Sequence, residues 1–538
     1  MNAARFTFAS LFCCLALMLG ATGIAQSRES REIELSVLKD KVQGGMAGQM
    51  VGVGYGGPTE FRACAEIYEK DIKWQPSMIA DALAQDDLYV EMTFTEVMDK
   101  YGLDAPIERY GEAFKDTKYL LFHANAAARR WLNNGVKPPM SGHPKYNLHA
   151  IDIDFQIEAD FIGLMCPGMP QTAIDLCDRI GRVMNHGDGV YGGMFVAGMY
   201  AEAYFETDVE KVVEAGVACM PKGSKYRAII EDVIAFHAAV PDDWRACWRF
   251  VYEKYEYQDP CPEGSLTPFN IDASINGAYI AIGLLYGDGD FEKTMEISTR
   301  CGQDSDCNPA NAVGILGAMY GLGKLEDRWV GQLDKVVDKN FVHTNYSFNS
   351  FIESTMKRIQ DAVKRAGGEV RDGRVHIPVQ HPVPPALDEW SPGVPVASLQ
   401  YDDDAWTWSG DWEEEEKGGY AALAAMVSHS GGNVATLEFS GSAISLVGYC
   451  TTNGGMAEVF IDGKRVGEIN AYIVPGTFEQ DLWHAYDLEN GPHTVRIVTL
   501  DKADPRSIDS CRPAGGMGRA DDRPKRFEIH RAVVFRPE

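Results

Sequence analysis

The chain has 538 residues, of which 45% are hydrophobic and 24% are charged, a balance that excludes a mainly disordered protein. This length is more than one ordinary hydrophobic core accommodates, so we expect two or three domains. With 50 Lys and Arg against 78 Asp and Glu, the formal net charge is −28, which would repel nucleic acids and anionic membrane surfaces. A small-molecule or glycan substrate held through a bound cation is compatible with this charge.

Residues 1–25 are typical of a secretory signal peptide. Arg5 precedes an apolar stretch, residues 6–19, which is too short to span a bilayer comfortably. Cleavage after Ala25 would leave Gly23 and Ala25 at the positions that a signal peptidase inspects, although an uncleaved membrane anchor is the alternative. No later stretch has about 18 consecutive apolar residues, so we expect a secreted or periplasmic protein without stable membrane insertion after cleavage.

Residues 30–375 have the pattern of an all-α domain. Residues 208–218 and 226–239, for example, carry apolar residues at spacings of three and four, the period of an amphipathic helix. The proline-rich stretch that follows has neither a helical nor a strand period, which predicts an extended linker over residues 376–398.

Residues 399–538 have the period of β-strands instead. Five short strand-like runs are separated by turns: 436–439, 443–449, 457–461, 493–500 and 527–535. Asp462-Gly463 predicts a two-residue hairpin turn, because both residues tolerate positive φ. The expected fold class is therefore multidomain α and β, with a large all-α bundle followed by a β-sandwich (jelly-roll-like) domain.

Residues 302–321, GQDSDCNPANAVGILGAMYG, form the most informative segment of the helical region. Asn308 can cap a helix and Pro309 suits its first turn, so residues 310–320 should form the helix body. Asp304 and Asp306 then lie just ahead of the helix N-terminus. Two carboxylates at this spacing suit one hard divalent cation, although they also suit the positive end of a helix dipole.

Two other features of the helical region point to a ligand. Gln85-Asp86-Asp87 supplies a second pair of carboxylates, and Glu60 follows the glycine-rich run of residues 44–57. A glycine-rich turn lets the backbone approach a ligand, although a helix end with its loop explains such a run almost as well. This run is not a P-loop, because no Gly-Lys-Ser/Thr sequence closes it.

Three motifs, in this order, resemble the ADP-ribosylglycohydrolase family, whose members include the dinitrogenase reductase-activating glycohydrolase. They are GQMVG…GGPTEF at residues 48–61, QDDLY at residues 85–89 and GQDSDCN at residues 302–308. Residues 274–298 look like the helix pair that precedes the last motif in the family. Asn185-His186 is similar to the family's Ser/Thr-His before a small-residue helix, and the whole resemblance covers roughly residues 35–323.

The resemblance implies an orthogonal all-α bundle that holds two Mg²⁺ or Mn²⁺ ions. The implied metal ligands are the aspartates of the last two motifs, Asp86, Asp87, Asp304 and Asp306. Glu60 takes the position of the family's active-site glutamate, so the implied catalytic residues are Glu60, Asp87 and Asp304. His186 would bind and orient the substrate, and Gly302 would allow a close approach beside the metal loop.

Three positions depart from the family pattern. The family's first aspartate is Gln49 here, the hydroxyl ligand before the aspartate pair is Gln85, and the last threonine of the closing motif is Cys307. A glutamine carbonyl can coordinate Mg²⁺, whereas a thiol is a poor partner for such a hard ion. We therefore expect the aspartates to bind cations, with the second of the two sites weak, absent or altered.

A third acidic segment lies at residues 152–170, where a largely apolar sequence carries four acids that cannot all be buried without partners. If residues 156–164 form a helix, one acid could reach the cleft. Glu158 and Asp160 are therefore reserve candidates for substrate binding or acid–base catalysis. A solvated helix start is the alternative.

The C-terminal region looks like the galactose-binding-like sandwiches that accompany extracellular sugar-active enzymes. Four tryptophans offer faces for sugar rings, or else fill the sandwich core: Trp406, Trp408, Trp412 and Trp483. Cys450 and Cys511 can pair in an oxidising compartment.

These observations leave three functions open. The first is a secreted, metal-dependent glycohydrolase that cleaves an ADP-ribosyl or other ribosyl-type bond, with Glu60 or one of the aspartates taking a proton from the attacking water. The second is the same scaffold acting on an extracellular polysaccharide, which the appended sandwich suggests. The third is a non-catalytic carbohydrate-binding protein, which Gln49, Gln85 and Cys307 suggest.

Overall fold

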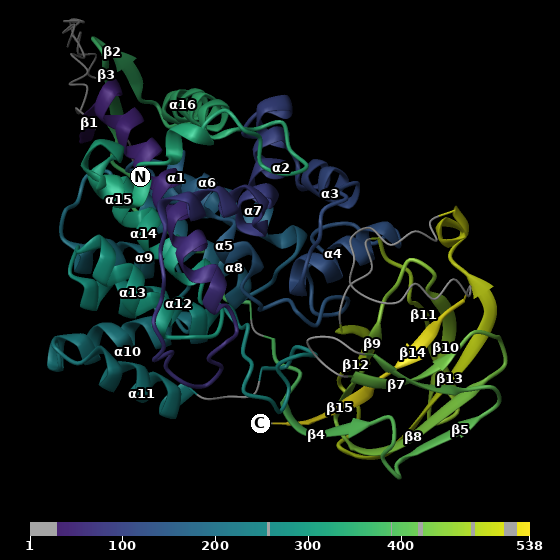
Figure 1. Cartoon of the computed structure of the whole chain (residues 1–538). Coiled ribbons are helices and arrows are strands. Elements are labelled where there is room, and N and C mark those ends of the chain that lie inside the picture. The colour runs from purple at the N-terminus through teal and green to yellow at the C-terminus, as the bar shows by residue number, and fades with distance from the viewer. Residues whose placement is uncertain are drawn as a thin grey trace, which may run out of the picture.

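The computed structural model describes residues 29–255, 259–388, 390–417, 423–474, 479–509 and 525–537. Helices make up the N-terminal part and antiparallel strands the C-terminal part, and the two parts lie side by side (Figure 1). The predicted fold class, a large helical domain followed by a β-sandwich, is confirmed.

The described residues of the N-terminal part form sixteen α-helices. They are α1 (Leu35–Gly56), α2 (Asp86–Tyr101), α3 (Ile107–Lys115), α4 (His123–Asn133), α5 (Asp154–Ile157), α6 (Asp160–Leu164), α7 (Pro170–Ile180), α8 (Asp188–Ala203), α9 (Val209–Ala218), α10 (Lys225–Ala239), α11 (Trp244–Tyr255), α12 (Ala273–Gly287), α13 (Phe291–Arg300), α14 (Cys307–Tyr320), α15 (Asp327–Val330) and α16 (Phe348–Arg365). A 3₁₀ turn, η1 (Gly57–Thr59), directly extends α1. Three short strands, β1 (Ser30–Glu34), β2 (Glu369–Arg371) and β3 (Arg374–Pro378), form a small antiparallel sheet in the order β1-β3-β2.

Helices α1 and α14 touch through their backbones along a stripe of glycines. The glycines of α1 recur at every fourth position: Gly44, Gly48, Gly52 and Gly56. A methyl group on any of them would lie within 2.5 Å of an atom in residues 305–317. Only glycine permits this approach. Because α14 follows the acidic loop of residues 302–306, the packing places that loop against the end of α1.

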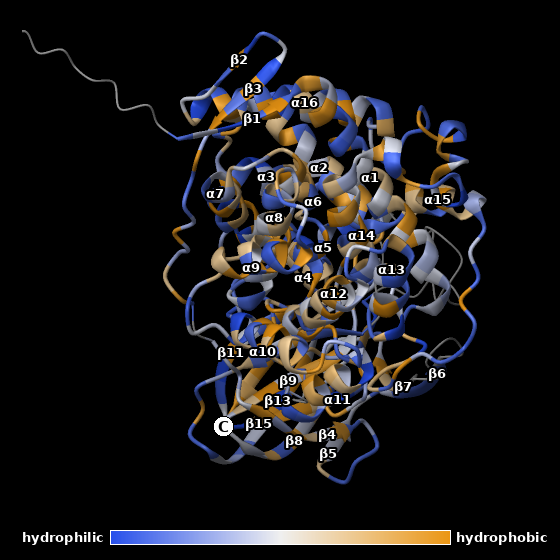
Figure 2. Ribbon diagram, turned by 90° about the vertical axis from the view of Figure 1, so that its left-hand side faces the viewer, coloured by the Kyte–Doolittle hydropathy of each residue, from blue (hydrophilic) through white to orange (hydrophobic). Residues whose placement is uncertain are grey.

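Three helices at the centre of the helical domain are surrounded by other parts of the domain. Helices α8, α12 and α14 are buried around almost their whole circumference, which explains why their sequences are small and apolar without a polar face. Figure 2 shows apolar residues gathered on these central helices. The peripheral helix α16 instead alternates buried and exposed residues, as expected for a helix with one face in solvent.

Helices α9 and α10 confirm two helices predicted from the sequence. The side chain of Asp208 caps α9 by accepting a hydrogen bond from the backbone N–H of Glu210 at 3.1 Å. Ser224 caps α10 in the same way through the backbone N–H of Arg227 at 3.2 Å.

Two other helix predictions require correction. The single helix predicted over residues 156–164 is two short helices, α5 and α6, interrupted at Glu158 and Ala159. Helix α14 begins at Cys307, and Asn308 does not cap it, because the Asn308 side chain donates to Asn276 Oδ1 at 2.9 Å inside the domain.

The proline-rich stretch predicted as a linker is fastened to the helical domain. Its first residues belong to β3, which pairs with β1. Further on, Gln380 accepts a hydrogen bond from the backbone N–H of Thr172 at 3.0 Å, and Asp388 pairs with Arg182 at 2.7 Å. These contacts hold the extended chain against α7 and η3 (Gly181–Val183). The domain boundaries themselves stay a prediction.

Twelve strands of the described residues form the C-terminal domain. They are β4 (Val394–Gln400), β5 (Trp406–Ser409), β6 (Glu413–Lys417), β7 (Leu423–Ser428), β8 (Val434–Gly441), β9 (Ala443–Tyr449), β10 (Gly455–Ile461), β11 (Lys464–Asn470), β12 (Glu479–Ala485), β13 (Gly491–Ala503), β14 (Phe527–Ile529) and β15 (Arg531–Arg536). They make antiparallel sheets in the orders β11-β10-β13-β8-β5, β12-β9-β15-β4 and β14-β7-β6. Leu437 and Val459 from the first sheet share one core with Leu446 and Val534 from the second, so these two sheets pack face to face.

The hairpin predicted at Asp462-Gly463 is confirmed, with φ values of 49° and 78° between β10 and β11. The predicted run 527–535 is two strands, β14 and β15, which belong to different sheets. Trp406 is buried in the sandwich core, and the ring of Trp408 stacks on it at 5.1 Å between centroids. Trp406 therefore fills the sandwich core and does not offer its face to a sugar ring.

Two predictions fall outside the described residues. Residues 1–28 include the predicted signal peptide, and Cys511 is the predicted partner of Cys450. Both stay predictions. Among the helices that the structure describes, none combines the length and the apolar character needed to cross a membrane.

The two domains are joined by a buried arginine. The guanidinium of Arg130 in α4 donates to the backbone carbonyls of Asp481 at 2.6 Å, Leu482 at 3.0 Å and Asn470 at 3.1 Å. Beside it, Nε2 of His484 in the β-domain forms a hydrogen bond with the backbone carbonyl of Pro144 at 3.0 Å. One planar guanidinium thus connects α4 to β11 and β12.

We expect Arg130→Ala to uncouple the two domains. Hydrogen bonds to a charged donor contribute about 1.5–3 kcal/mol each, and the substitution also leaves buried carbonyl groups unpaired. Scanning calorimetry should show a lower first transition or two separate transitions. Arg109→Ala removes an exposed pair with Glu112 and a cation–π contact with the ring of Tyr101, both outside the domain junction, so it is the control and should change little.

Candidate functional site

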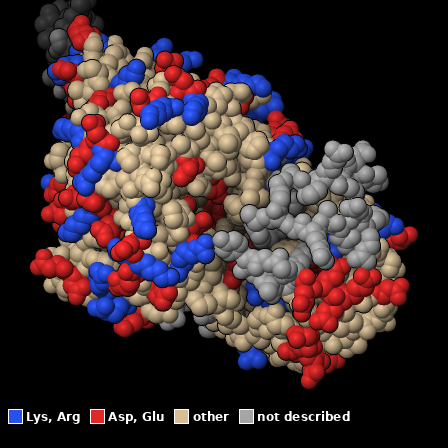
Figure 3. Space-filling view, in the orientation of Figure 1, with Lys and Arg blue, Asp and Glu red and all other residues tan. Residues whose placement is uncertain are grey.

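Three segments far apart in the sequence bring their acidic residues together beyond the end of α1. Glu60 follows η1, Asp86 and Asp87 begin α2, and the loop before α14 carries Asp304 and Asp306. Asp87, Asp304 and Asp306 are at most 4% exposed, whereas solvent reaches Glu60. Figure 3 shows acidic side chains inside a hollow of the helical domain that faces the β-domain.

Backbone contacts hold the 302–306 loop in this place. Gly302 has a φ of 82° and Gln303 a φ of 54°, and a methyl group on Gly302 would lie 2.3 Å from the Ala63 carbonyl oxygen. The backbone N–H of Gln303 donates to that carbonyl at 2.9 Å, and the Phe61 N–H donates to the Gln303 carbonyl at 3.1 Å. Gly302 is thus required by the close approach of two chains, and its role in substrate binding stays a prediction.

Burial and mutual repulsion disfavour the charged forms of these carboxyl groups. Burial, followed by the charge of Glu60, raises the pKa of Asp304 to about 8. The pKa of Asp87 and that of Asp306 lie well above the usual range because of burial and the neighbouring carboxylates. Desolvation, then Asp306 and Asp86, raise the pKa of Glu60 to about 9. Arg62 opposes this shift at Glu60, but the net effect is a raised pKa, so added positive charge would stabilise the ionised forms.

The donor atoms of the cluster fit hard divalent cations. All five side chains are carboxylates, the ligand type that Mg²⁺ and Mn²⁺ prefer. Oδ1 of Asp87 is buried and has no hydrogen-bond partner among the described residues. A buried anion in such a position requires a proton or a cation beside it. The cluster is therefore a candidate metal centre.

The thiol of Cys307 points into this centre. Its Sγ lies 3.4 Å from Asp87 Oδ2, and its backbone N–H donates to Asp304 Oδ1 at 3.3 Å. Gln85 stands at the N-cap of α2 and is partly exposed. A thiol is a weak ligand for a hard ion, so the expectation of one altered cation site stays a prediction.

A further set of buried acids adjoins the centre. Glu91 lies one helical turn after Asp87 in α2, and the charges of Asp160 and Asp87, after burial itself, raise its pKa well above the usual range. Asp160 accepts hydrogen bonds from the Tyr200 hydroxyl and from Asn311 Nδ2, the latter at 2.6 Å. Glu91 was not among the residues predicted from the sequence. Its spacing of four residues from Asp87 places both on one face of the helix, but the local sequence does not show that Glu91 is buried.

Glu158 and His186, the remaining two predicted site residues, make contacts with Asn125 and His143 respectively. Glu158 is fully buried and hydrogen-bonds to Asn125 Nδ2, and burial followed by the charge of Asp154 raises its pKa well above the usual range. The ring of His186 lies 4.8 Å from that of His143, between centroids. Roles for Glu158, Asp160 and His186 in substrate binding stay predictions.

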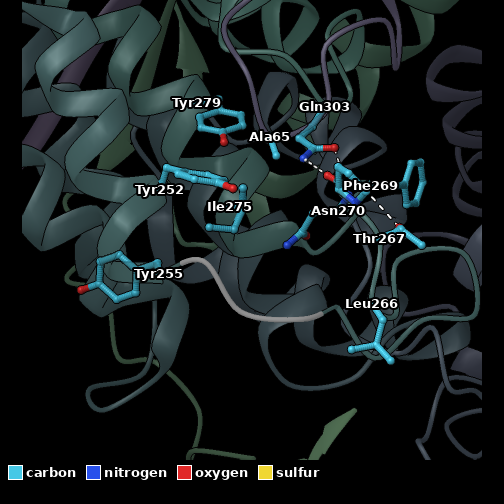
Figure 4. A pocket seen from close by; sticks show the side chains of 11 residues that line it. Ala65, Tyr252, Tyr255, Leu266, Thr267, Phe269, Asn270, Ile275, Tyr279 and Gln303 are labelled. Carbon is cyan, nitrogen blue, oxygen red and sulfur yellow. Dashed lines mark hydrogen bonds between the residues drawn. The ribbon is translucent and has the colours of Figure 1, made fainter. Parts of the chain in front are cut away.

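An aromatic cavity of about 280 Å³ adjoins the acidic loop (Figure 4). Gln303, directly before Asp304, forms part of its wall, and its side chain accepts from the Asn270 N–H and donates to the Pro268 carbonyl, both at 2.9 Å. Four aromatic side chains line the cavity: Tyr252, Tyr255, Phe269 and Tyr279. Aromatic faces beside a polar group suit the binding of a sugar ring.

Divalent cations should stabilise the protein more at alkaline than at acidic pH. The usual pKa of an aspartate is 3.8 and that of folded, cation-free Asp304 is about 8, so the folded state holds a proton that the unfolded state releases. The free energy of unfolding of the cation-free protein therefore falls as the pH rises through this window. A cation replaces that proton, so the gain in melting temperature with Mg²⁺ should be larger at about pH 8 than at about pH 5.5. An equal gain at both values would contradict this assignment.

Two curated proteins of Flavonifractor plautii are similar to parts of the chain. One, an A type blood N-acetyl-alpha-D-galactosamine deacetylase, is 32% identical over 140 residues, which are 26% of this chain and 17% of that protein. The other, an A type blood alpha-D-galactosamine galactosaminidase, is 35% identical over 92 residues, which are 17% of this chain and 8% of that protein. The chain thus spans less than a fifth of the length of either relative.

One solved structure and one protein family are similar to parts of the chain. A solved ADP-ribosylglycohydrolase-related protein complex is 15% identical, with a TM-score of 0.42 over 60% of this chain and 98% of that one. Residues 34–364, more than half of the sequence, match the family described as ADP-ribosylglycohydrolase. The chain belongs to the ADP-ribosylglycohydrolase family.

Proposed function

We propose that this protein is a metal-dependent glycohydrolase whose catalytic centre is the acidic cluster around Asp87, Asp304 and Asp306. The observation that carries the proposal is the convergence of five carboxylates from three separate segments at one partly open site, with a buried oxygen of Asp87 left without a partner. Burying several carboxyl groups together destabilises the folded state. Membership of a hydrolase family offers a catalytic reason for their presence.

The roles of the residues follow from their exposure. Asp86, Asp87, Asp304 and Asp306 would hold Mg²⁺ or Mn²⁺, and a cation bound there would supply positive charge to fix sugar hydroxyls and oppose negative charge in the transition state. Glu60 is the most exposed member of the cluster. Its raised pKa means that it holds a proton in the cation-free protein, and positive charge beside it would favour the ionised carboxylate that is suited to take a proton from the attacking water.

Glycosidic cleavage also requires the sugar to be held in one orientation. The cavity whose wall includes Gln303, the residue before Asp304, would receive part of the substrate against its aromatic side chains. The first substrate class that we propose is an ADP-ribosyl or other ribosyl-type glycoside, following the family. The aspartate cluster would then bind vicinal hydroxyl groups of the ribose.

An extracellular glycan is the second candidate substrate. It is favoured by the two relatives named for action on galactosamine, together with the attached β-sandwich. A signal peptide over residues 1–25, with secretion or export to a periplasm, belongs to the same proposal, as do the domain limits 30–375 and 399–538.

Product analysis tests the proposal. Purified protein is incubated with Mg²⁺ and an ADP-ribosylated peptide, in parallel with a panel of glycans that includes N-acetylgalactosamine-terminated ones, and products are identified by mass spectrometry. Release of ADP-ribose supports the first substrate class, and release of a free sugar supports the second. Absence of any product with every substrate would contradict a glycohydrolase and favour a non-catalytic carbohydrate-binding protein.

A further inference from the structure

A second group of metal-ligand side chains lies outside the acidic cluster, where the helical domain meets the β-domain. His123 begins α4, His149 and Asp152 lie in the turn before α5, and Glu263 lies in the loop before α12. His149 Nδ1 forms a hydrogen bond with Asp152 Oδ2 at 2.7 Å, and His123 Nδ1 is 3.9 Å from the same oxygen. Glu263 Oε2 is 4.0 Å from both of these histidine nitrogens. Candidate ligand atoms of His123, His149 and Asp152 thus lie within 4.8 Å of one another, and Glu263 joins this group through His149.

The spacing of these atoms suits a tetrahedral ion. Four ligands at the Zn–N and Zn–O distances of about 2.0–2.2 Å stand about 3.3–3.6 Å from one another. Four of the six separations are 2.7–4.0 Å, which brackets that value. The shortest of them is the hydrogen bond between His149 and Asp152, which a bound ion would replace.

Two of these four donor atoms lack partners, and so do two further atoms of the same side chains. His123 Nδ1 and Glu263 Oε2 have no hydrogen-bond partner among the described residues, and the same holds for His149 Nε2 and Asp152 Oδ1. His149 and Asp152 are 0% exposed. Buried polar atoms in folded proteins are nearly always satisfied, so four unsatisfied atoms in one cluster indicate a missing ligand.

The chemistry of the ligands differs from that of the all-carboxylate centre. Nitrogen donors from two histidines select Zn²⁺ and similar transition metals over Mg²⁺. The thiol of Cys261 lies in the same cluster, with candidate ligand atoms within 4.8 Å of those of His149 and Glu263, and it donates to Asp259 Oδ2 at 3.1 Å. A nearby sulfur strengthens the preference for a softer ion.

The backbone around the cluster is held by hydrogen bonds. Asn185 Nδ2 donates to the carbonyls of Ala150 at 3.1 Å and Asp152 at 2.8 Å, which fixes the turn that carries two of the ligands. Asn147 Oδ1 accepts from the backbone N–H of His149 at 3.0 Å. Supporting contacts of this kind orient metal ligands before the ion binds.

We propose that His123, His149, Asp152 and Glu263 bind one Zn²⁺-class ion. Four protein ligands describe a closed, structural site. The site would fasten the loop that carries Glu263, and this loop is the one that Arg531 of the β-domain contacts through the Pro262 carbonyl. The ion would therefore stabilise the junction of the two domains, independently of whether the acidic cluster hydrolyses a glycosidic bond.

Zinc binding to the purified protein tests this proposal. The protein is equilibrated with Zn²⁺ in the presence of excess Mg²⁺, freed of unbound metal, and its zinc content is measured by mass spectrometry. We expect one zinc ion per chain. His123→Asn should lower the zinc affinity at least about 10-fold, and Glu263→Gln should do the same. Asparagine tolerates the positive φ of 39° at residue 123, so the first variant should fold.

Two control variants separate this site from other effects. His343 has a similar backbone, with a φ of 59°, but lies outside the cluster, so His343→Asn should keep its zinc. Asp304→Asn should keep its zinc too, because it changes only the acidic cluster. The proposal is overturned if the wild type binds no zinc, if His123→Asn and Glu263→Gln bind it as tightly as the wild type, or if Asp304→Asn loses it.

Discussion

Asp304→Asn is expected to abolish hydrolysis while leaving the helical domain folded. Removing a residue that merely supports a metal ligand costs about 10- to 100-fold in metal affinity or activity, so neutralising a ligand itself should cost at least about 100-fold. The asparagine can still accept the hydrogen bond from the Cys307 N–H, which preserves the start of α14. Divalent-cation binding, measured by titration calorimetry, should weaken together with the activity.

The stability of the same variant gives an independent test. Because burial raises the pKa of Asp304 to about 8, its carboxylate opposes folding at alkaline pH in the absence of cations. The cation-free variant should therefore melt higher than the cation-free wild type at about pH 8, by roughly 2 °C. Asp372→Asn, in an exposed turn whose φ of 52° suits asparagine, is the matched control for both measurements. Full activity in the Asp304 variant would refute its assignment to the catalytic centre.

Gly48→Ala should cause a large loss of stability. Its Cβ would lie 2.2 Å from the Val313 carbonyl oxygen of α14, and this neighbour is backbone rather than a flexible side chain. Overpacking of this kind costs about 3 kcal/mol or more, which exceeds the gain of about 1 kcal/mol in helix propensity. For a domain of this size we expect the melting temperature to fall by about 5 °C or more.

Gly323→Ala is the matched control for this prediction. Gly323 lies just after α14, and the nearest atom to an added Cβ is Asp40 Oδ1 at 3.5 Å, an ordinary contact. Its melting temperature should stay close to that of the wild type. If Gly48→Ala were equally stable, the close packing of α1 on α14 would not be what places the acidic loop.

Much of the fold could be predicted from the sequence because local signals were strong. The period of the helices at residues 208–218 and 226–239 and the turn at Asp462-Gly463 depend only on neighbouring residues, and both are confirmed. The break at Glu158 was not predictable. It depends on the burial of that side chain against Asn125 of α4, a contact between segments distant in the sequence.

The candidate site could be predicted as a set of residues but not as a geometry. The motifs around Asp87 and Asp304 identified the acids that the fold brings together. Glu91 was missed because a single acid within a helix carries no local sign of burial. The ring of His186 packs against that of His143, a contact that a linear sequence cannot show, and its role in substrate binding stays a prediction.

The cluster of His123, His149, Asp152 and Glu263 could not be predicted from sequence motifs. His123, His149 and Glu263 are separated by 26 and 114 residues, a spacing that no metal-binding motif has. His149 and Asp152 are three residues apart, which alone is a weak signal. Tertiary structure assembles these ligands from three segments, and only the unsatisfied buried atoms reveal them.

Cation depletion and restoration test the central claim most directly. The purified protein is stripped of metal with a chelator, returned to chelator-free buffer, and assayed by mass spectrometry on the substrate that the wild type cleaves, before and after addition of Mg²⁺ or Mn²⁺. We predict no hydrolysis by the stripped protein, recovery with the added cation, and no recovery for Asp304→Asn. Undiminished hydrolysis by the fully stripped protein would contradict a metal-dependent centre at Asp87, Asp304 and Asp306.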